Sequence, residues 1–444
     1  ALDGVSCMAC HTQSPSSAGL TFSGDLGFDS ARVYGPYHED QINPNIMQFF
    51  VGLTPGYGEH IVNSTVCAGC HTLMTQTVDL AGQPTGDEFV EQATYHEWKN
   101  SVFSTNETHC NTCHMPRIDG PVILAAEYAF LNPQTPFGLH HLVGGNVHVL
   151  EILKANREAL AIPATEAQFD STIARTRSLL TQRTVDAELV LTERTLDTAY
   201  FALRLENRAG HRFPSGAPAR RAFVRFVVRN AVGDTLFASG TWDATHEVLG
   251  HDADHEPHYD VIREPEHVQI YELVMGDVTG AATTVLERAK EPLKDNRLVP
   301  LGFSTTHASY DTTRLAGHVL EDPNFNRTAT NAEGSGTDVV HYHVAMNGEE
   351  GGLHASAEVF YQAVPPRAVL PMFAHQGERI DRFRTMYAQS DGTPIRVAAD
   401  SIALGPMGMP QRPQERIVVL PNPTLDGAVE IRYASEDRVE LMAT

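Results

Sequence analysis

Three short segments of this 444-residue chain combine two cysteines, three positions apart, with a histidine directly behind them: CMACH (7–11), CAGCH (67–71) and CNTCH (110–114). A Cys-x-x-Cys pair can hold zinc, form a redox disulfide or anchor a c-type heme. Heme attachment is the chemistry that uses all three residues, because each thiol adds to a vinyl group and the histidine nitrogen binds the iron.

The repetition of the segment favours heme. The protein has 6 cysteines, and every one lies in such a segment. Structural zinc sites usually use cysteines in fours, and three redox disulfides would leave the following histidines without a role. The sequence therefore predicts three covalent hemes c. The predicted attachment residues are Cys7, Cys10, Cys67, Cys70, Cys110 and Cys113, and the predicted proximal iron ligands are His11, His71 and His114.

The opposite side of each iron is open to a second ligand. A second imidazole gives a low-spin iron suited to electron transfer, whereas an open position makes a binding or catalytic site. Of 22 histidines, 19 are left for this role. We expect His60 and His141, or the neighbouring His140, to complete two irons, and His211 or His38 to serve the third. His96, His109 and His148 are reserves.

The composition limits the partners and the compartment. A formal net charge of -23 opposes binding to nucleic acid and to anionic membrane surfaces, and heme propionates would add to it. The sequence contains no run of about 18 apolar residues, so it predicts no membrane-spanning helix. Heme attachment to Cys-x-x-Cys-His normally takes place outside the cytoplasm, so we expect an exported protein, and the start at Ala1 is typical of a chain after signal cleavage.

Periodicity divides the chain into five parts, and the predicted fold class is multidomain. Residues 1–145 form a loop-rich, partly helical heme-binding domain, with a short helix in QATYHEWKNSVF, and residues 146–185 form a helical hairpin. Period-two segments such as AYFALRLEN and AFVRFVVRN predict an antiparallel β-sandwich over 186–375. A helix with a Pro/Gly linker (376–416) and a β-type tail (417–444) follow.

The loop GHDADHEPHYD gathers histidines and aspartates. Mixed imidazole and carboxylate ligands can bind a divalent metal, but an acidic solvated loop has the same composition and is the favoured interpretation. The residues in question are His251, Asp252, Asp254, His255, His258 and Asp260. An alternative role for His258 is to lie close to a heme.

Two longer patterns resemble known families. The run from YGPYHED through CAGCHTL to CNTCHMP, with LHHLVGGNVHVLEIL and GHRFPSGAPARRAFVRFVV after it, resembles exported bacterial multiheme cytochromes c. The resemblance covers about residues 1–365 and implies covalent hemes, usually with two axial histidines each, and long-range electron transfer. The tail LPNPTLDGAVEIRY looks like the start of a type IX secretion sorting domain, which implies the cell surface or the medium.

The predicted function is electron transfer and not enzymatic catalysis: three close hemes carry electrons toward an extracytoplasmic or extracellular acceptor, with redox proteins as partners. The alternative is a redox enzyme that reduces a small nitrogen or sulfur oxyanion at one open heme. A surface protein whose β-sandwich binds a partner is a third possibility. Because the first motif starts at Cys7, we expect its heme to be poorly covered. A second copy could cap it and supply the missing histidine, and a head-to-tail contact of that kind builds a filament. The alternative is a monomer in which His38 folds back over the first heme.

Overall fold

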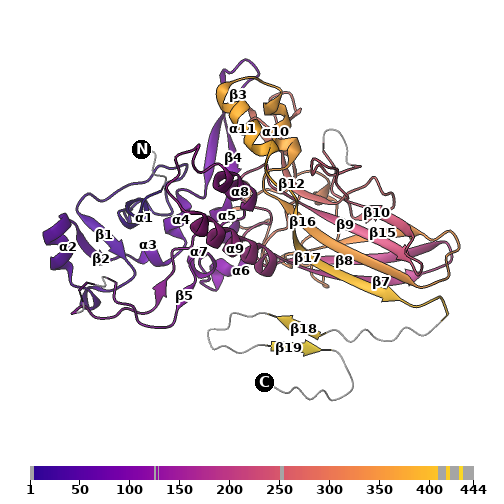
Figure 1. Ribbon diagram of the computed structural model, residues 1–444, viewed down its shortest axis with the longest axis horizontal. Coiled ribbons are helices and arrows are strands. Elements are labelled where there is room, and N and C mark those ends of the chain that lie inside the picture. Colours follow the sequence, from indigo (N-terminus) through magenta and orange to yellow (C-terminus); the bar gives the residue numbers. More distant parts are fainter. Residues whose placement is uncertain are drawn as a thin grey trace.

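The computed structural model describes residues 5–408, apart from 125, 126, 129 and 251–254, and the strands 417–420 and 430–433. The chain forms an elongated molecule with two parts (Figure 1). The three Cys-x-x-Cys-His motifs lie in the first part, and long strands form the second part.

The first part is built from short elements joined by loops. Its helices are α1 (Cys7–His11), α2 (Pro44–Val51), α3 (Glu59–Val62), α4 (Thr65–Ala68), α5 (Thr94–Lys99), α6 (Val102–Thr105) and α7 (Cys110–His114). Its strands pair in twos: β1 (Arg32–Gly35) with β2 (Thr54–Tyr57), β3 (Leu73–Val78) with β4 (Pro84–Gln92), and β5 (Arg117–Ile118) with β6 (Phe137–Gly138). The helix expected in QATYHEWKNSVF is α5 followed by α6.

The hairpin of β3 and β4 is absent from the sequence prediction. Its turn is closed by the side chain of Asp79, which accepts hydrogen bonds from the backbone N–H groups of Ala81 and Gln83. Such Asx turns need only one aspartate and are weak signals in a loop-rich sequence. The hairpin reaches the second part, where Thr77 Oγ1 donates to the carbonyl of Ala289 at 2.7 Å.

The first part lacks a hydrophobic core of its own among the described residues. Phe89 is its one contribution to the buried apolar clusters, and it packs against Leu273, Met275 and Ala289 of the second part. More than half of the large apolar side chains that are exposed in the described residues precede residue 146. A region of this size needs apolar surface to bury.

Two helices connect the parts. Helix α8 (Val147–Ala155) starts at Asn146, whose side chain accepts from Val149 N–H. Helix α9 (Glu166–Arg183) starts with a capping box between Thr165 and Gln168, the usual signature of a helix start. Both helices fall in the segment 146–185 where the sequence predicted a helical hairpin, and their apolar faces pack on the sheet core.

The second part contains two sheets (Figure 1). The larger has the order β13 (Ala282–Thr283), β12 (Ile270–Gly276), β9 (Arg221–Asn230), β16 (Leu353–Gln362) and β17 (Ile395–Leu404); β10 (Thr235–Ser239) pairs with β9, and β14 (Glu291–Asp295) with β12. The smaller has the order β11 (Val261–Ile262), β15 (Thr337–Ala345), β8 (Thr198–Asn207) and β7 (Val185–Arg194). The pairs are antiparallel except β11 with β15, which is parallel.

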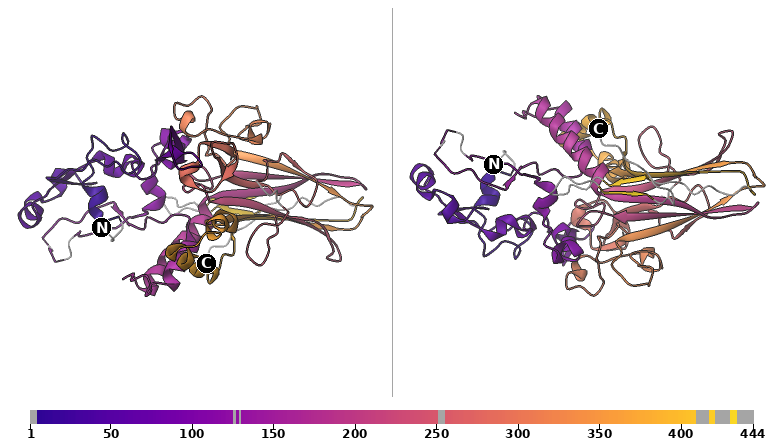
Figure 2. Two further views of the ribbon diagram at one scale, coloured as in Figure 1. Left: turned by 90° about the horizontal axis from the view of Figure 1, so that it is seen from above. Right: turned by 90° about the horizontal axis from the view of Figure 1, so that it is seen from below.

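The two sheets share one core, and the views in Figure 2 show them as two layers. The ring of Phe226 on β9 stacks on Tyr342 of β15 with centroids 4.0 Å apart, and meets Phe201 of β8 edge-on. Residues 201, 203 and 205 of β8 are fully buried, in agreement with the alternation read from the sequence.

The end of the chain differs in detail from the predicted boundaries. Strand β17 pairs with β16, so the larger sheet extends to residue 404 instead of ending near 375. Helices α10 (Pro366–Phe373) and α11 (Glu378–Ala388) lie between these strands; α11 was expected and α10 was not. Strands β18 (Ile417–Leu420) and β19 (Glu430–Tyr433) pair with each other, and the Pro-Asn-Pro turn lies outside the described residues. None of the helices described in this chain is long and apolar enough to cross a membrane.

Candidate heme-binding sites

The three motifs occupy the same kind of local structure. CMACH and CNTCH each form a one-turn helix, α1 and α7, and CAGCH begins in α4. One helical turn brings the two thiols of a motif to the same side as the histidine that follows. All six cysteines are free thiols.

The histidine of the third motif faces a histidine from the second part. The rings of His114 and His211 have centroids 6.4 Å apart and planes 21° from parallel. His114 Nδ1 lies 2.6 Å from the carbonyl oxygen of Val143, and His211 Nδ1 lies 2.8 Å from that of Arg212. A carbonyl can only accept, so both Nδ1 atoms donate and both Nε2 atoms carry a lone pair.

This spacing suits two ligands of one metal ion. A metal–imidazole bond is about 2 Å long and the nitrogen lies about 1 Å from the centre of its ring, so two imidazoles on opposite sides of one ion have centroids about 6 Å apart. The hydrogen bond from Nδ1 to a carbonyl is the usual second contact of a metal-binding histidine, because it fixes the ring and the tautomer. The pair of His114 and His211 therefore fits the axial positions of a heme iron.

The first motif has a similar pair. The rings of His11 and His140 have centroids 6.1 Å apart, and His11 Nδ1 lies 2.6 Å from the carbonyl oxygen of Tyr34. His140 lies in the segment 139–143, which also crosses the third motif, where Leu142 N–H donates to the carbonyl of His114. One short segment thus contributes to two sites.

The second motif differs from the other two. No ring among the described residues lies opposite His71 in the manner of His140 or His211. Desolvation by the surrounding protein lowers the pKa of His71, and electrostatic interactions with the nearby His114 and with the guanidinium of Arg220 lower it further. Arg220 donates to the carbonyl of Ser215 at 2.7 Å, and its Nε is buried without a hydrogen-bond partner.

The second motif lies between the first and the third. The thiols of Cys67 and Cys110 are hydrogen-bonded, which raises the pKa of Cys67 and lowers that of Cys110. The second motif also lies close to the first. Burial raises the pKa of Cys10, and the electrostatic interaction with Cys70 raises it further. The segment that follows the first motif also packs on the second motif. Gly24 N–H donates to the carbonyl of Gly69, and a Cβ atom added at Gly69 would collide with Leu26. The three motifs are therefore direct neighbours, in chain order.

The other expected axial ligands lie elsewhere. His60 is buried behind the first motif, where its Nε2 donates to the carbonyl of Gln13 at 2.9 Å and its ring meets Tyr34 edge-on. His38 is exposed and stacks on Tyr57 with centroids 4.0 Å apart. His141 is half-buried, and it is its neighbour His140 that faces His11. Among these candidates, the structure brings His211 and His140 to a motif histidine.

The same observations test the alternatives to heme. None of the six cysteines forms a disulfide, and the one group of three possible metal ligands within the described residues contains no cysteine. A porphyrin is a large apolar ring, and the first part, as far as the structure describes it, exposes apolar side chains and has no separate hydrophobic core. The residues therefore fit covalently attached heme better than zinc or redox disulfides.

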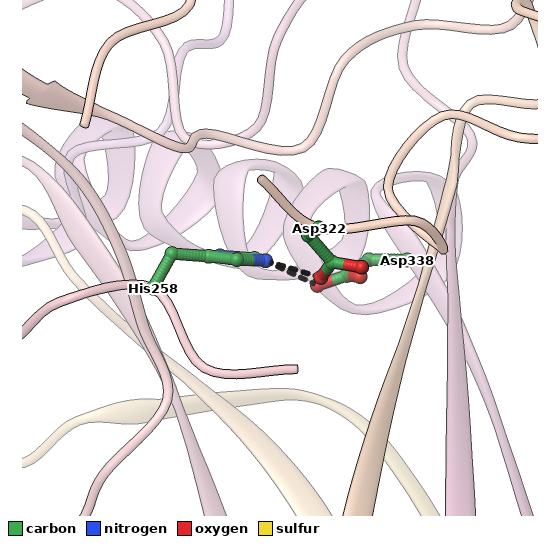
Figure 3. Close-up of side chains that lie close together, drawn as sticks. All are labelled: His258, Asp322 and Asp338. Carbon is green, nitrogen blue, oxygen red and sulfur yellow. Dashed lines mark hydrogen bonds and ion pairs between the residues drawn. The ribbon is translucent and has the colours of Figure 1, made fainter. Parts of the chain in front are cut away.

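The histidine–aspartate loop leads to a buried cluster in the second part (Figure 3). His258 Nε2 lies 2.7 Å from Asp322 and 3.7 Å from Asp338, and the three side chains are 1%, 1% and 0% exposed. Tyr271 donates to Asp338 at 2.6 Å. Burial raises the pKa of Asp338 to about 6, and the neighbouring Asp322 charge adds to this rise. Residues 251–254, with His251, Asp252 and Asp254, lie outside the described residues.

The hydrogen bonds of His258 argue against metal binding at this ring. The amide groups of Gln269 and Asn296 lie 2.9 and 3.0 Å from Nδ1. Their orientation is fixed, since Gln269 Oε1 accepts from Tyr259 N–H and Asn296 Oδ1 accepts from Glu272 N–H. Both amides therefore donate to Nδ1, so the proton of the neutral ring is on Nε2, the atom that faces the carboxylates.

Comparisons with known proteins are sparse. No protein-family model matches the chain, and no curated protein sequence matches it. The solved structure of a penta-heme cytochrome c552 from Thermochromatium tepidum is similar with a TM-score of 0.46 and 15% sequence identity, over 90% of this chain and 77% of that chain. A TM-score this low shows neither a shared fold nor a shared function, so we infer function from the residues of this chain.

Proposed function

We propose that this protein is a multiheme c-type cytochrome that holds three hemes c at its Cys-x-x-Cys-His motifs and transfers electrons between redox partners. The observation that carries the proposal is the pairing of two motif histidines with a second imidazole at 6.1 and 6.4 Å. Covalently bound heme supplies a reversible one-electron couple, and two imidazole ligands favour electron transfer over substrate binding.

The chain's own residues have clear tasks in this proposal. Cysteine thiols attach the cofactors, and carbonyl groups of Tyr34 and Val143 orient the motif histidines. The contact between neighbouring motifs keeps successive sites close, with the second motif in the middle. The second part, which we propose to be a β-sandwich, supplies His211 and covers the third site.

The location and the partners belong to the same proposal. Since attachment to Cys-x-x-Cys-His takes place outside the cytoplasm, we propose an extracytoplasmic protein that is secreted or surface-bound, with the periplasm as the alternative. The net charge of -23 favours positively charged partners or acceptors. His140 is exposed and faces His11, so a neighbouring copy is not needed to supply this ligand; in a filament, a second copy would only cover the exposed first site.

Absorption, mass and magnetic resonance measurements test the proposal. The intact mass of the exported protein should exceed that of the polypeptide by three hemes, and electron paramagnetic resonance of the oxidised protein should show at least two low-spin sites with two imidazole ligands. A protein that contains zinc, or that carries no covalent heme after export with the c-type maturation machinery, would overturn it.

A second candidate function is favoured by one observation, the guanidinium of Arg220 near His71. A positive side chain at a heme with an open position would attract a small oxyanion, such as nitrite or sulfite. The second heme would then be a site of reduction, fed by its neighbours. Three results together would favour this function over electron transfer alone. The oxidised protein should show a high-spin ferric signal that integrates to one heme, nitrite or sulfite should change that signal, and neither anion should change it in Arg220→Gln.

A further inference from the structure

Four charged side chains are buried together where the two parts of the molecule meet. They are Glu97 of α5, Arg212 of the loop after β8, Asp295 at the end of β14 and Arg297 just beyond it. Their side chains are 0%, 0%, 6% and 9% exposed, respectively. Arg297 lies 3.1 Å from Glu97 and 2.8 Å from Asp295, and Arg212 is paired with Asp295. Buried ions of this kind are retained only with close partners, and this set is electrically neutral.

Glu97 is the one member of this set that belongs to the heme-binding part. It lies on the buried face of α5, between the second and third motifs. Its Oε2 accepts from the backbone N–H of Arg212 at 3.2 Å and from the hydroxyl of Ser215 at 2.6 Å. Glu97 therefore contacts the residue that follows His211.

The peptide between His211 and Arg212 is held from both sides. Its N–H donates to Glu97, and its carbonyl accepts from the side-chain amide of Asn207 at 2.8 Å. The next carbonyl, that of Arg212, accepts from His211 Nδ1 at 2.8 Å. A carboxylate from the heme-binding part thus fixes the backbone that in turn fixes the ring opposite His114.

We propose that Glu97 is a positioning residue for His211, and that its negative charge lowers the reduction potential of the heme held between His114 and His211. The proposal rests on the proposed function. An oxidised heme carries one positive charge more than a reduced heme, so a nearby carboxylate stabilises the oxidised state. Loss of the Glu97 charge would leave the set of four with a net positive charge and would favour reduction.

The test uses Glu97→Gln in the full heme-loaded protein, with Glu272→Gln as the matched control. Glu272 is also a buried glutamate with a close cation, Lys294 at 3.0 Å, but it contacts neither histidine pair. In Glu97→Gln we expect three attached hemes and a rise in the potential of one of them. At a fixed electrode potential, the ratio of the reduced to the oxidised form of this heme should increase about tenfold. This corresponds to a rise of about 59 mV in the reduction potential of a one-electron couple.

A second variant separates charge from position. Glu97→Asp keeps the charge but shortens the side chain, so we expect a nearly unchanged potential with a shifted low-spin resonance signal for one heme. It also serves if Glu97→Gln does not fold. Glu272→Gln should lower stability and leave all heme signals as they are.

Two outcomes distinguish the inference from the function on which it rests. If the Glu97 variants leave the potentials and resonance signals of all hemes unchanged, while His211→Ala removes one low-spin signal, the inference is overturned and the proposed function remains. If His211→Ala also has no effect on any heme, the assignment of His211 itself fails.

Discussion

His114 and His211 face each other across 6.4 Å between ring centroids, with both Nδ1 atoms engaged by carbonyl groups. One ring comes from a Cys-x-x-Cys-His motif and the other from the loop between β8 and β9. In the proposed function the two-sheet region is thus a working part of a redox site.

Substitution of His211 by alanine should remove one axial ligand from one heme iron. With one imidazole lost, that iron becomes high-spin or binds water, and about one third of the low-spin signal should disappear if all three sites are low-spin. Electron paramagnetic resonance and the visible spectrum of the oxidised protein measure this. His354→Ala, at an exposed histidine of β16, is the control and should leave the spectrum intact. An unaltered His211→Ala spectrum would contradict the pairing.

Adjacent histidines should give different results at the first motif. His140 faces His11 and His141 does not, so His140→Ala should remove one low-spin signal while His141→Ala should retain it. The two variants differ by one position in the chain, and each is the control for the other. The reverse pattern would show that His141 is the ligand.

Removal of one attachment motif should unfold part of the molecule. In Cys110→Ala/Cys113→Ala the mass should fall by one heme. Residues 5–145 should become sensitive to protease, because the described part of this range has no separate hydrophobic core. The two sheets have their own core and should stay resistant. Limited proteolysis followed by mass spectrometry locates the cuts. Equal resistance in both parts would mean that the hemes are not needed to fill the first part.

The buried Asp338 should make stability depend on pH. Its pKa is raised to about 6, so the folded protein keeps this proton at pH values where the unfolded chain has lost it. The free energy of unfolding should therefore fall as pH rises from about 4 to 7, by about 3 kcal/mol on account of this group.

Asp338→Asn should remove this contribution, because an amide does not ionise and keeps the shape of the carboxyl group. Urea unfolding at pH 4, 5, 6 and 7 should show that the free energy of unfolding of the variant rises relative to that of wild type as pH increases, by about 3 kcal/mol over this range. The matched control is Asp311→Asn, at a side chain that is 83% exposed, and it should follow the wild type. Parallel curves for wild type and Asp338→Asn would contradict the raised pKa.

The sequence predicted the elements whose signals are local. The long strands followed from alternation, and the helical hairpin from apolar residues near helical spacing, because these patterns need no knowledge of distant contacts. The hairpin of β3 and β4 was not predicted, because an Asx turn is a weak signal in a loop-rich sequence, and the short helix α10 was not predicted, because it contains Pro366 and Pro371. The extension of the larger sheet to β17 depends on pairing with β16, which a pattern within β17 does not reveal.

The sites show the same division. Each motif identifies its two thiols and the histidine that we predict as the proximal ligand. The histidine opposite it comes from a distant part of the sequence, so only the folded structure shows which one it is. His211 was a candidate because glycine and a turn surround it, whereas the order of His140 and His141 depends on which ring the backbone turns toward His11. Glu97 was missed; its signal is a glutamate on the buried face of a short helix, between Tyr95 and Trp98.

If the proposed function holds, the lack of a separate hydrophobic core among the described residues of 5–145 makes the folding of this protein depend on its supply of heme. The first part precedes the sheets in the chain, so it is made first, and we expect it not to fold stably by itself. In the proposed function, the thiols must receive their hemes before this part has enough apolar surface to bury, and His211 would complete the third site only when the sheets have formed. Maturation would then be ordered, and a chain that has not received its hemes would remain open to proteases and be degraded before it could take part in electron transfer.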